Sequence, residues 1–369
     1  MNAVKDLYDV WLASACMPPD TLKTLLSVYG DPLSCYEAFL RDRTSFHTVL
    51  SPRFCSLLEE NSSVEFLSGI RATMEKHSIH VLRFSDPAFP DALKNIQDSP
   101  AVLFYQGSLD CLTNKALAMV GSRAASYSGQ RAAERLAEKL SRQNITIISG
   151  LASGIDACAH KGCIQGGSPT IAVTGCGLDT IYPRDNEPLR NSILDKNGLI
   201  LSEYIPGVKP AGWHFPFRNR IITGLASALI LMEARLRSGS MTSVHHALDQ
   251  GKDVFVYPGE PNSQYYEGNH QLLREGGIYF TSAEDILADM DWLDNPPAVR
   301  QNSDCSTEKS SFSPEEAAVL SALDKGKMSF EQLLSSTGSD PSALMSVLTI
   351  LQINGRIEAL PGKQYQLKH

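Results

Sequence analysis

The sequence predicts an α/β fold: an extended Rossmann-like, mostly parallel sheet at the core, a helical N-terminal domain and a C-terminal winged-helix domain. In the middle of the chain, short apolar runs alternate with helical patterns, and several runs end at a glycine. Residues 1–75 show helical patterns without a clear strand, and residues 312–369 read as three short helices followed by a hairpin. Continuous apolar strands that alternate with helices are typical of a parallel sheet covered on both faces.

The middle of the chain supplies the expected strands and the helices between them. The strands are expected at 116–120, 145–149, 170–174, 198–203, 228–233 and 253–258. Helical patterns cover 129–143 and 153–165. Ligands of open α/β folds bind at the carboxyl edge of the sheet, so the turns that follow these strands are the first place to look for a site.

The flanks of this region have their own signals. Residues 76–293 are expected to form the sheet domain, and the polar, proline-bearing stretch 294–311 is expected to be a linker. Beyond it, Ser313 and Ser329 begin capping boxes, and Asp340 precedes a third helix. This order is the winged-helix pattern.

Composition narrows the class of protein. The chain has 369 residues and a net charge of −8, which argues mildly against a nucleic-acid partner. Residues 207–240, however, hold five basic side chains against Glu233 alone, and screening confines the relevant field to about 10 Å, so a local patch can bind a polyanion.

No apolar run reaches about 18 residues and no signal pattern opens the chain, so we expect a cytoplasmic protein without a membrane span. The eight cysteines form no CxxC pair and are expected to be reduced, with no metal or cofactor bound.

Four glycine-bearing turns lie at expected strand ends, at 119–129, 148–160, 173–186 and 233–243. Small residues at a strand-to-helix turn expose backbone N–H groups beside the positive end of a helix, which is an anion site. The small residues expected to contact the ligand are Gly121, Ser122, Gly150, Ser153, Gly175, Ser238 and Gly239. The turns match neither the dinucleotide nor the P-loop pattern, so neither ligand is indicated.

Arginines near these turns indicate which anion binds. Arg123, Arg184, Arg218 and Arg220 are too many for one small phosphate and suit a chain of phosphates, each gripped by one guanidinium. Arg218 and Arg220 are two apart, so neither a helix nor a strand core easily explains both; a surface salt-bridge cluster is the alternative. Phe215 and Phe217 either stack on exposed bases or pack beside the sheet.

The motifs GSRAASYSG, SGLASGIDACAH, TIAVTGCGLDTIYP, FPFRNRIITGLA and EARLRSGSMTSVHHAL occur in this order. Together they resemble the DNA-processing protein A family, also called Smf, over residues 115–280. The resemblance implies a single-stranded-DNA-binding Rossmann domain that forms homodimers and helps load the RecA recombinase during natural transformation. It also implies a SAM- or helix-hairpin-helix-like N-terminal domain and a C-terminal winged helix, and it places Arg123, Arg184, Arg218 and Arg220 at the DNA.

A hydrolase of nucleoside monophosphates, of the phosphoribohydrolase type, is the closest rival. Such an enzyme needs a positioned acid or base, and only Glu203 and Glu233 qualify; helix or loop capping is the alternative role for both. Asp156 and His160 are four apart on one helix, which suits two ligands of one metal, but no third ligand is evident. We therefore expect no enzyme and no metal.

The winged helix lacks the usual marks of a duplex reader. Its third helix, within 340–354, contains no Lys or Arg, and its basic residues, Arg356, Lys363 and Lys368, lie in the expected wing. We therefore expect a protein-contact or regulatory module.

Overall fold

The computed structural model describes residues 5–292, 314–323, 326–353, 357–360 and 364–367. The chain divides into two compact units, Met1–Pro297 and Ala298–His369, which are described separately. The expected linker 294–311 and the capping residue Ser313 lie outside the described residues.

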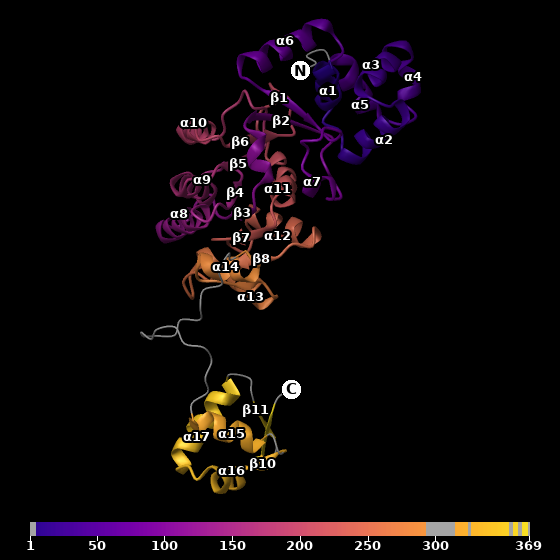
Figure 1. The fold of residues 1–369 in the computed structure, drawn as a ribbon. Coiled ribbons are helices and arrows are strands. Elements are labelled where there is room, and N and C mark those ends of the chain that lie inside the picture. The colour runs from indigo at the N-terminus through magenta and orange to yellow at the C-terminus, as the bar shows by residue number, and fades with distance from the viewer. Residues whose placement is uncertain (1–4, 293–313, 324–325, 354–356, 361–363, 368–369) are drawn as a thin grey trace. The chain divides into compact units, whose positions relative to one another are not determined.

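In the described part of the chain, the first unit opens with six helices, as predicted for the N-terminus (Figure 1). They are α1 (Lys5–Ser14), α2 (Pro19–Tyr29), α3 (Pro32–Arg41), α4 (Arg43–Phe46), α5 (Pro52–Glu60) and α6 (Val64–Lys76). Asp31 and Ser63 cap two of them by accepting hydrogen bonds from backbone N–H groups. Trp11, Phe39 and Phe46 are fully buried between them and share one apolar cluster with the nearby end of the sheet.

A nine-stranded sheet follows, in the order β1-β2-β6-β5-β4-β3-β7-β8-β9. Its strands are β1 (His80–Arg83), β2 (Val102–Gly107), β3 (Ala116–Val120), β4 (Thr146–Ser149), β5 (Thr170–Thr174), β6 (Leu199–Ser202), β7 (Ala228–Leu231), β8 (Val254–Val256) and β9 (Ile278–Tyr279). The pairs β1–β2 and β2–β6 are antiparallel, and all others are parallel. The mostly parallel sheet confirms the predicted fold class, while β1, β2 and β9 were not predicted.

Strand β3 lies at the centre of the sheet and is buried along its whole length. Leu117 pairs with Ile147 of β4 on one side and with Ala228 of β7 on the other. The β7 partner lies more than a hundred residues further along the chain, so the direction of the strand order reverses at β3. Ligand sites of open α/β folds form at such reversal points.

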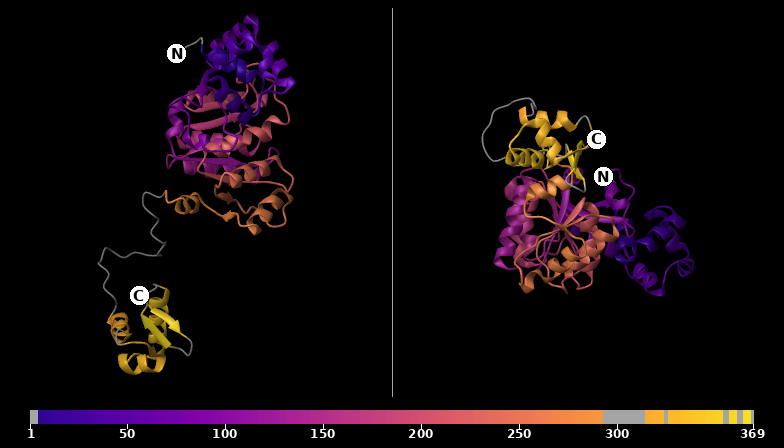
Figure 2. Two further views of the ribbon diagram at one scale, coloured as in Figure 1. Left: turned by 90° about the vertical axis from the view of Figure 1, so that its right-hand side faces the viewer. Right: turned by 90° about the horizontal axis from the view of Figure 1, so that it is seen from below.

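Helices cover both faces of the sheet (Figures 1 and 2). They are α7 (Asp91–Lys94), α8 (Tyr127–Ser141), α9 (Ile155–Gly166), α10 (Glu187–Asp195), α11 (His214–Leu225), α12 (Gly239–Asp249), α13 (Glu267–Arg274) and α14 (Ala283–Asp289), with short 3₁₀ turns η1 (Leu109–Thr113), η2 (Arg184–Asn186) and η3 (Gln264–Tyr266). Leu117 of β3 belongs to the same apolar cluster as Leu136 of α8 on one face, and Ala118 belongs to the same cluster as Ile222 of α11 on the other. Alternate residues of one strand thus serve two cores, as the continuous apolar runs predict.

The second unit has its own core. It contains α15 (Pro314–Leu323), β10 (Met328–Ser329), α16 (Phe330–Thr337), α17 (Pro341–Ile353), β11 (Ile357–Leu360) and β12 (Gln364–Leu367). The strands form an antiparallel sheet in the order β10-β12-β11, and Val319, Leu333 and Leu348 are buried against one another. The predicted capping box is present: Ser329 accepts from Gln332 N, and the Gln332 side chain accepts from Ser329 N. Arg356, Lys363 and Lys368 lie outside the described residues.

Across the described parts of both units, every helix is too short or too polar to cross a bilayer.

Candidate functional site

A pocket of about 620 Å³ opens at the carboxyl edge of the sheet. Its walls come from the segments that follow β3, β4, β5, β6 and β7, so it lies at the reversal of strand order around β3. Seven of the predicted site residues line it: Gly121, Ser122, Arg123, Phe215, Arg218, Ser238 and Gly239. The turns from both sides of the central strand are thereby brought to one cavity.

Close backbone contacts hold the turns together. Ser122 N donates to Glu233 O at 2.7 Å, and Ile155 N donates to Ser122 O at 3.2 Å, which links the turns after β7, β3 and β4. A Cβ on Gly121 would lie 2.6 Å from Ile155, so only glycine permits this approach. Gly154 has φ +78°, and a Cβ there would meet Ser122 O at 2.3 Å.

The carboxylate of Glu233 has a structural partner. Its oxygens accept hydrogen bonds from Ser126 N at 3.0 and 3.1 Å, and Ser126 Oγ donates to Oε2 at 2.5 Å. Ser126 also caps α8 by accepting from Gly129 N at 3.0 Å. Glu233 is fully buried, so it fixes the start of α8, which is the capping role considered above.

The start of α12 forms one wall of the pocket. Gly239, Ser240 and Ser243 line the cavity, and the hydroxyls of Ser238 and Ser240 lie 2.6 Å apart. The first N–H groups of a helix have no partner within it, and the helix dipole makes this end positive. This wall therefore suits an anionic group.

Arg123 and Phe215 form the rim. The Arg123 side chain is exposed, and its guanidinium carbon lies 4.7 Å from the Phe215 ring centroid. The ring of Tyr182, which also lines the pocket and is 42% exposed, lies 5.3 Å from that of Phe215. A cation over an aromatic face is held in place without losing its charge. A flexible surface arginine is therefore oriented toward the mouth of the pocket.

Arg218 lines the same pocket but from inside the protein. It is 4% exposed, and its Nη1 donates to Gly150 O at 2.9 Å and to Val173 O. Burial lowers the pKa of Arg218 to about 10, while the nearby Asp156 carboxylate opposes this shift. Asp156 is buried as well. Its burial raises the pKa of the carboxyl group, and the positive charge of Arg218 partly offsets this rise. The cation is rigidly placed by carbonyl oxygens.

Gly150 makes this arrangement possible. A Cβ at this position would lie 2.6 Å from both Arg218 Nη2 and Asp156 Oδ2, so the two charged groups flank the space above the glycine. Gly175 has a similar role beside Phe215: a Cβ added to Gly175 would lie 3.0 Å from Cδ1 of Phe215. Both predicted glycines thus shape the site, although neither lines the pocket.

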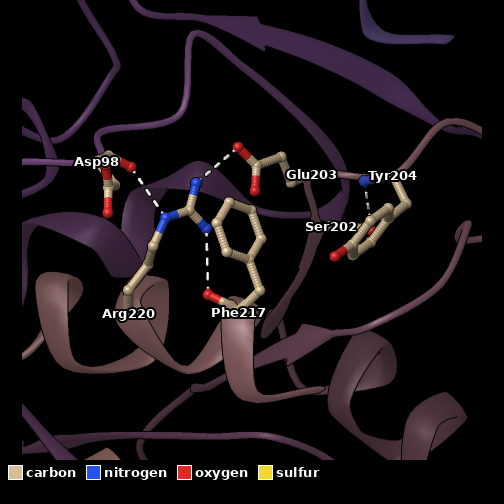
Figure 3. A network of polar contacts seen from close by, with 6 residues as sticks. All are labelled: Asp98, Ser202, Glu203, Tyr204, Phe217 and Arg220. Carbon is tan, nitrogen blue, oxygen red and sulfur yellow. Dashed lines mark hydrogen bonds and ion pairs between the residues drawn. The ribbon is translucent and has the colours of Figure 1, made fainter. Parts of the chain in front are cut away.

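Arg220 was predicted to grip a phosphate together with Arg218, but it does not line the pocket. It lies on the other side of α11, 2% exposed, with Nη2 donating to Glu203 Oε1 at 2.7 Å and Nε donating to Asp98 O at 2.9 Å (Figure 3). The Phe217 ring centroid lies 4.0 Å from its guanidinium carbon. A buried, paired arginine away from the pocket is a structural residue, so α11 itself explains both arginines.

The remaining predicted residues lie nearby. Arg184, in η2, and Ser153, before α9, are exposed but do not line the pocket. The pocket is also lined by residues that were not predicted as its walls: Tyr182, Asn219, Ser240, Ser243 and Asp156, the last considered only as a metal ligand. The aromatic at the turn after β5 and the asparagine between two arginines were the available signals.

Asp156 and His160 both lie buried on α9, and the hydrogen bonds of His160 define its tautomer. Thr170 Oγ1 donates to Ile147 O at 2.6 Å and lies 2.8 Å from His160 Nδ1, so Nδ1 carries the proton and donates to Thr170. Burial lowers the pKa of His160 to about 3, so the ring is neutral. Within the described residues, no group of three potential ligands is close enough to hold a metal ion.

Comparisons with known proteins agree with this fold. Residues 80–291 match the family model of DNA recombination-mediator protein A, and residues 303–363 match that of the DprA winged helix domain. The chain is 44% identical over 207 residues to DNA processing protein DprA of Streptococcus pneumoniae, covering 56% of this chain and 73% of the relative. It is 32% identical over 375 residues to protein Smf of Escherichia coli, covering 94% of each chain.

Solved structures of DprA proteins have a similar fold. The X-ray structure of DprA from S. pneumoniae superposes with a TM-score of 0.66 at 34% identity, covering 77% of this chain and 97% of that one. DprA from Helicobacter pylori, whose single-stranded DNA binding mode has been studied structurally, superposes with a TM-score of 0.52 at 30% identity, covering 57% and 95%. The chain, with its central sheet and its winged helix, belongs to the DNA recombination-mediator protein A family.

Proposed function

We propose that this chain binds single-stranded DNA along the pocket at the carboxyl edge of the sheet. The observation that carries the proposal is the joint presence of the exposed Arg123, the buried Arg218 and the start of α12 around one cavity. Two cations and a helix N-terminus supply separate positions for successive phosphates. The structural study of DNA binding in the H. pylori relative supports the choice of ligand.

The binding is mainly to the backbone of the strand. Arginines and backbone N–H groups contact phosphates irrespective of sequence, so base preference is slight. Log K should fall with log salt by about 0.7 for each phosphate neutralised. No covalent step is part of the proposal, because Glu203 and Glu233, the candidate acids, are held by Arg220 and Ser126.

We further propose that the protein acts as a homodimer that hands the strand to the RecA recombinase. Family membership supports this role, which the resemblance of the motifs also implies. The test is the rate of RecA filament formation on single strands coated by a single-strand-binding protein, with and without this protein. Sedimentation at several protein concentrations reports the dimer.

A titration with single-stranded oligonucleotides at several salt concentrations tests the binding proposal. Wild type is compared with an Arg123→Ala, Arg218→Ala double variant, and folding of the variant is checked by its unfolding transition. Equal affinity of the two folded proteins would refute the site. Incubation with AMP, followed by an assay for free adenine, tests the hydrolase alternative in the same preparation.

A further inference from the structure

A second pocket, of about 190 Å³, lies on the other side of the first turn of α11. Helices α1 and α2 form one wall through apolar side chains such as Leu12, Ala13 and Leu22. Trp213 and Phe217 form part of the opposite wall. Sites for drug-sized ligands span roughly 300–1,000 Å³, so this pocket fits a single planar ring system.

Two residues that line this pocket, Glu203 and Tyr204, each carry a buried polar atom without a hydrogen-bond partner among the described residues. Tyr204 is 4% exposed, and its hydroxyl has no hydrogen-bond partner among the described residues. Glu203 uses Oε1 to accept from Arg220, whereas its buried Oε2 likewise finds no partner in the described part of the chain. Figure 3 shows both atoms directed toward the side of Phe217. Buried polar atoms are normally paired, so a ligand in this pocket would need a donor for the Glu203 oxygen and an acceptor for the Tyr204 hydroxyl.

The first turn of α11 separates this pocket from the DNA pocket. Phe215 and Arg218 face the DNA pocket, whereas Trp213 and Phe217 face the second pocket. Trp213 is 59% exposed, and its ring lies 6.4 Å from that of Tyr204. A strand that leaves the DNA pocket over this turn therefore passes an exposed indole at the entrance to an apolar cavity.

We propose that the second pocket accepts one nucleobase of the bound strand, a proposal that rests on the proposed function. Every nucleobase has a flat π-face that stacks on the exposed Trp213 ring, together with a donor and an acceptor on its pairing edge. The donor fits Glu203 Oε2, and the acceptor fits the Tyr204 hydroxyl. Because Arg220 offsets the charge of Glu203, a neutral base suffices, and the phosphates stay with the arginines of the DNA pocket.

The proposal gives the acidic N-terminal helices a role in DNA binding. Residues 1–76 carry more acidic than basic side chains, so they repel phosphates. The wall that α1 and α2 present to the pocket is apolar, however, and it contacts a base without approaching the backbone of the strand.

Photocrosslinking tests the inference. An oligonucleotide containing 5-bromodeoxyuridine, which keeps the donor of the pairing edge, is bound to the full chain and irradiated, and crosslinked residues are located by mass spectrometry. A crosslink at Tyr204, which lies too deep for a strand on the surface, is the expected result. Crosslinks confined to Tyr182 and Phe215 would overturn the base pocket and leave DNA binding intact, whereas absence of any binding would overturn both proposals.

A pocket-filling variant gives a matched comparison. Ala13→Leu places a larger side chain in the pocket from α1, and Ala72→Leu makes the same change at an exposed position of α6. Ala13→Leu should remove the Tyr204 crosslink and weaken binding about fivefold, the loss expected for one base–aromatic contact, while Ala72→Leu changes neither. An unchanged Tyr204 crosslink in Ala13→Leu would contradict the inference.

Free thymidine separates a base of the strand from a free nucleoside. Excess thymidine should reduce the Tyr204 crosslink only modestly, because the tethered base is present at high effective concentration. Complete loss of the crosslink at thymidine levels that leave the oligonucleotide bound would show that the pocket takes free nucleosides, and would overturn the inference.

Discussion

The guanidinium of Arg123 lies over the ring of Phe215, with 4.7 Å between the guanidinium carbon and the ring centroid. The cation at the rim of the pocket is therefore oriented by an aromatic ring. An ion pair would reduce the charge available to a phosphate, whereas a ring orients the guanidinium and leaves its charge in place.

Replacing Arg123 by alanine should weaken single-stranded DNA binding and lower the slope of log K against log salt by about 0.7, the value for one lost phosphate contact. Arg142→Ala is the matched control, because Arg142 is an exposed arginine at the far end of α8. Fluorescence anisotropy at several salt concentrations gives both quantities. A slope that stays at its wild-type value in Arg123→Ala would exclude a phosphate contact.

The two phenylalanines of the FPFRNR segment should behave differently. Phe215→Leu removes the ring under Arg123, and should weaken binding by about 1–2 kcal/mol while the salt slope stays constant. Phe217→Leu removes the ring against Arg220, so it should mainly lower the free energy of unfolding. Equal effects of the two changes on affinity, measured on folded protein, would contradict this division.

Arg220 is expected to contribute to stability. Arg220→Met leaves the partly buried Glu203 without its partner and should lower the free energy of unfolding by about 3 kcal/mol, measured by urea denaturation. Adding Glu203→Gln should recover part of the loss. The slope of log K against log salt for DNA binding by Arg220→Met should match that of wild type. A reduced slope would show that Arg220 contacts a phosphate.

His160 should make stability depend on pH. Its folded pKa, about 3, lies below its ordinary value of 6.5, so as pH falls the unfolded chain takes up a proton before the folded chain does. The free energy of unfolding therefore falls between pH 6.5 and 3. His160→Asn, which keeps a donor for Thr170, should remove about 2 kcal/mol of the decrease between pH 7 and 5. Identical pH profiles would show that His160 takes up its proton over the same pH range in the folded and unfolded chains, and would contradict the lowered pKa.

The winged-helix unit should not be needed for binding to single strands. A chain that ends at Pro297 keeps the whole first unit, and α17 carries no Lys or Arg. Its affinity and salt slope should equal those of the full chain in the same anisotropy titration. A large loss of affinity would show that the second unit holds DNA.

Much of the architecture was predictable because its signals are local. Apolar runs such as 116–120 and 170–174 match β3 and β5, since strands buried on both faces need continuous hydrophobic sequence. The edge strand β1 and its neighbour β2 were missed, because they lie among turn residues outside the alternating pattern. Long-range pairing, which no local pattern encodes, gives them their strand conformation.

The site was predictable to a smaller extent. Glycine turns and Arg123 follow from composition at strand ends. The separation of Arg218 from Arg220 does not, because it depends on Gly150 leaving space on one side of α11 and on Glu203, seventeen residues away in sequence, pairing on the other. A side chain two residues along a helix points to a different face, and only the surrounding tertiary structure decides which face meets a ligand.

The position of β3 between β4 and β7 also has a consequence for folding order. Loops from the β4 side come early in the chain, but the α12 wall follows β7, whose pairing with β3 closes a loop of more than a hundred residues. Such non-local pairings are slow to form. A nascent or partly folded chain that lacks the β3–β7 pairing has only part of the sheet and lacks the α12 wall of the pocket. The pocket is therefore complete only when the whole domain has folded.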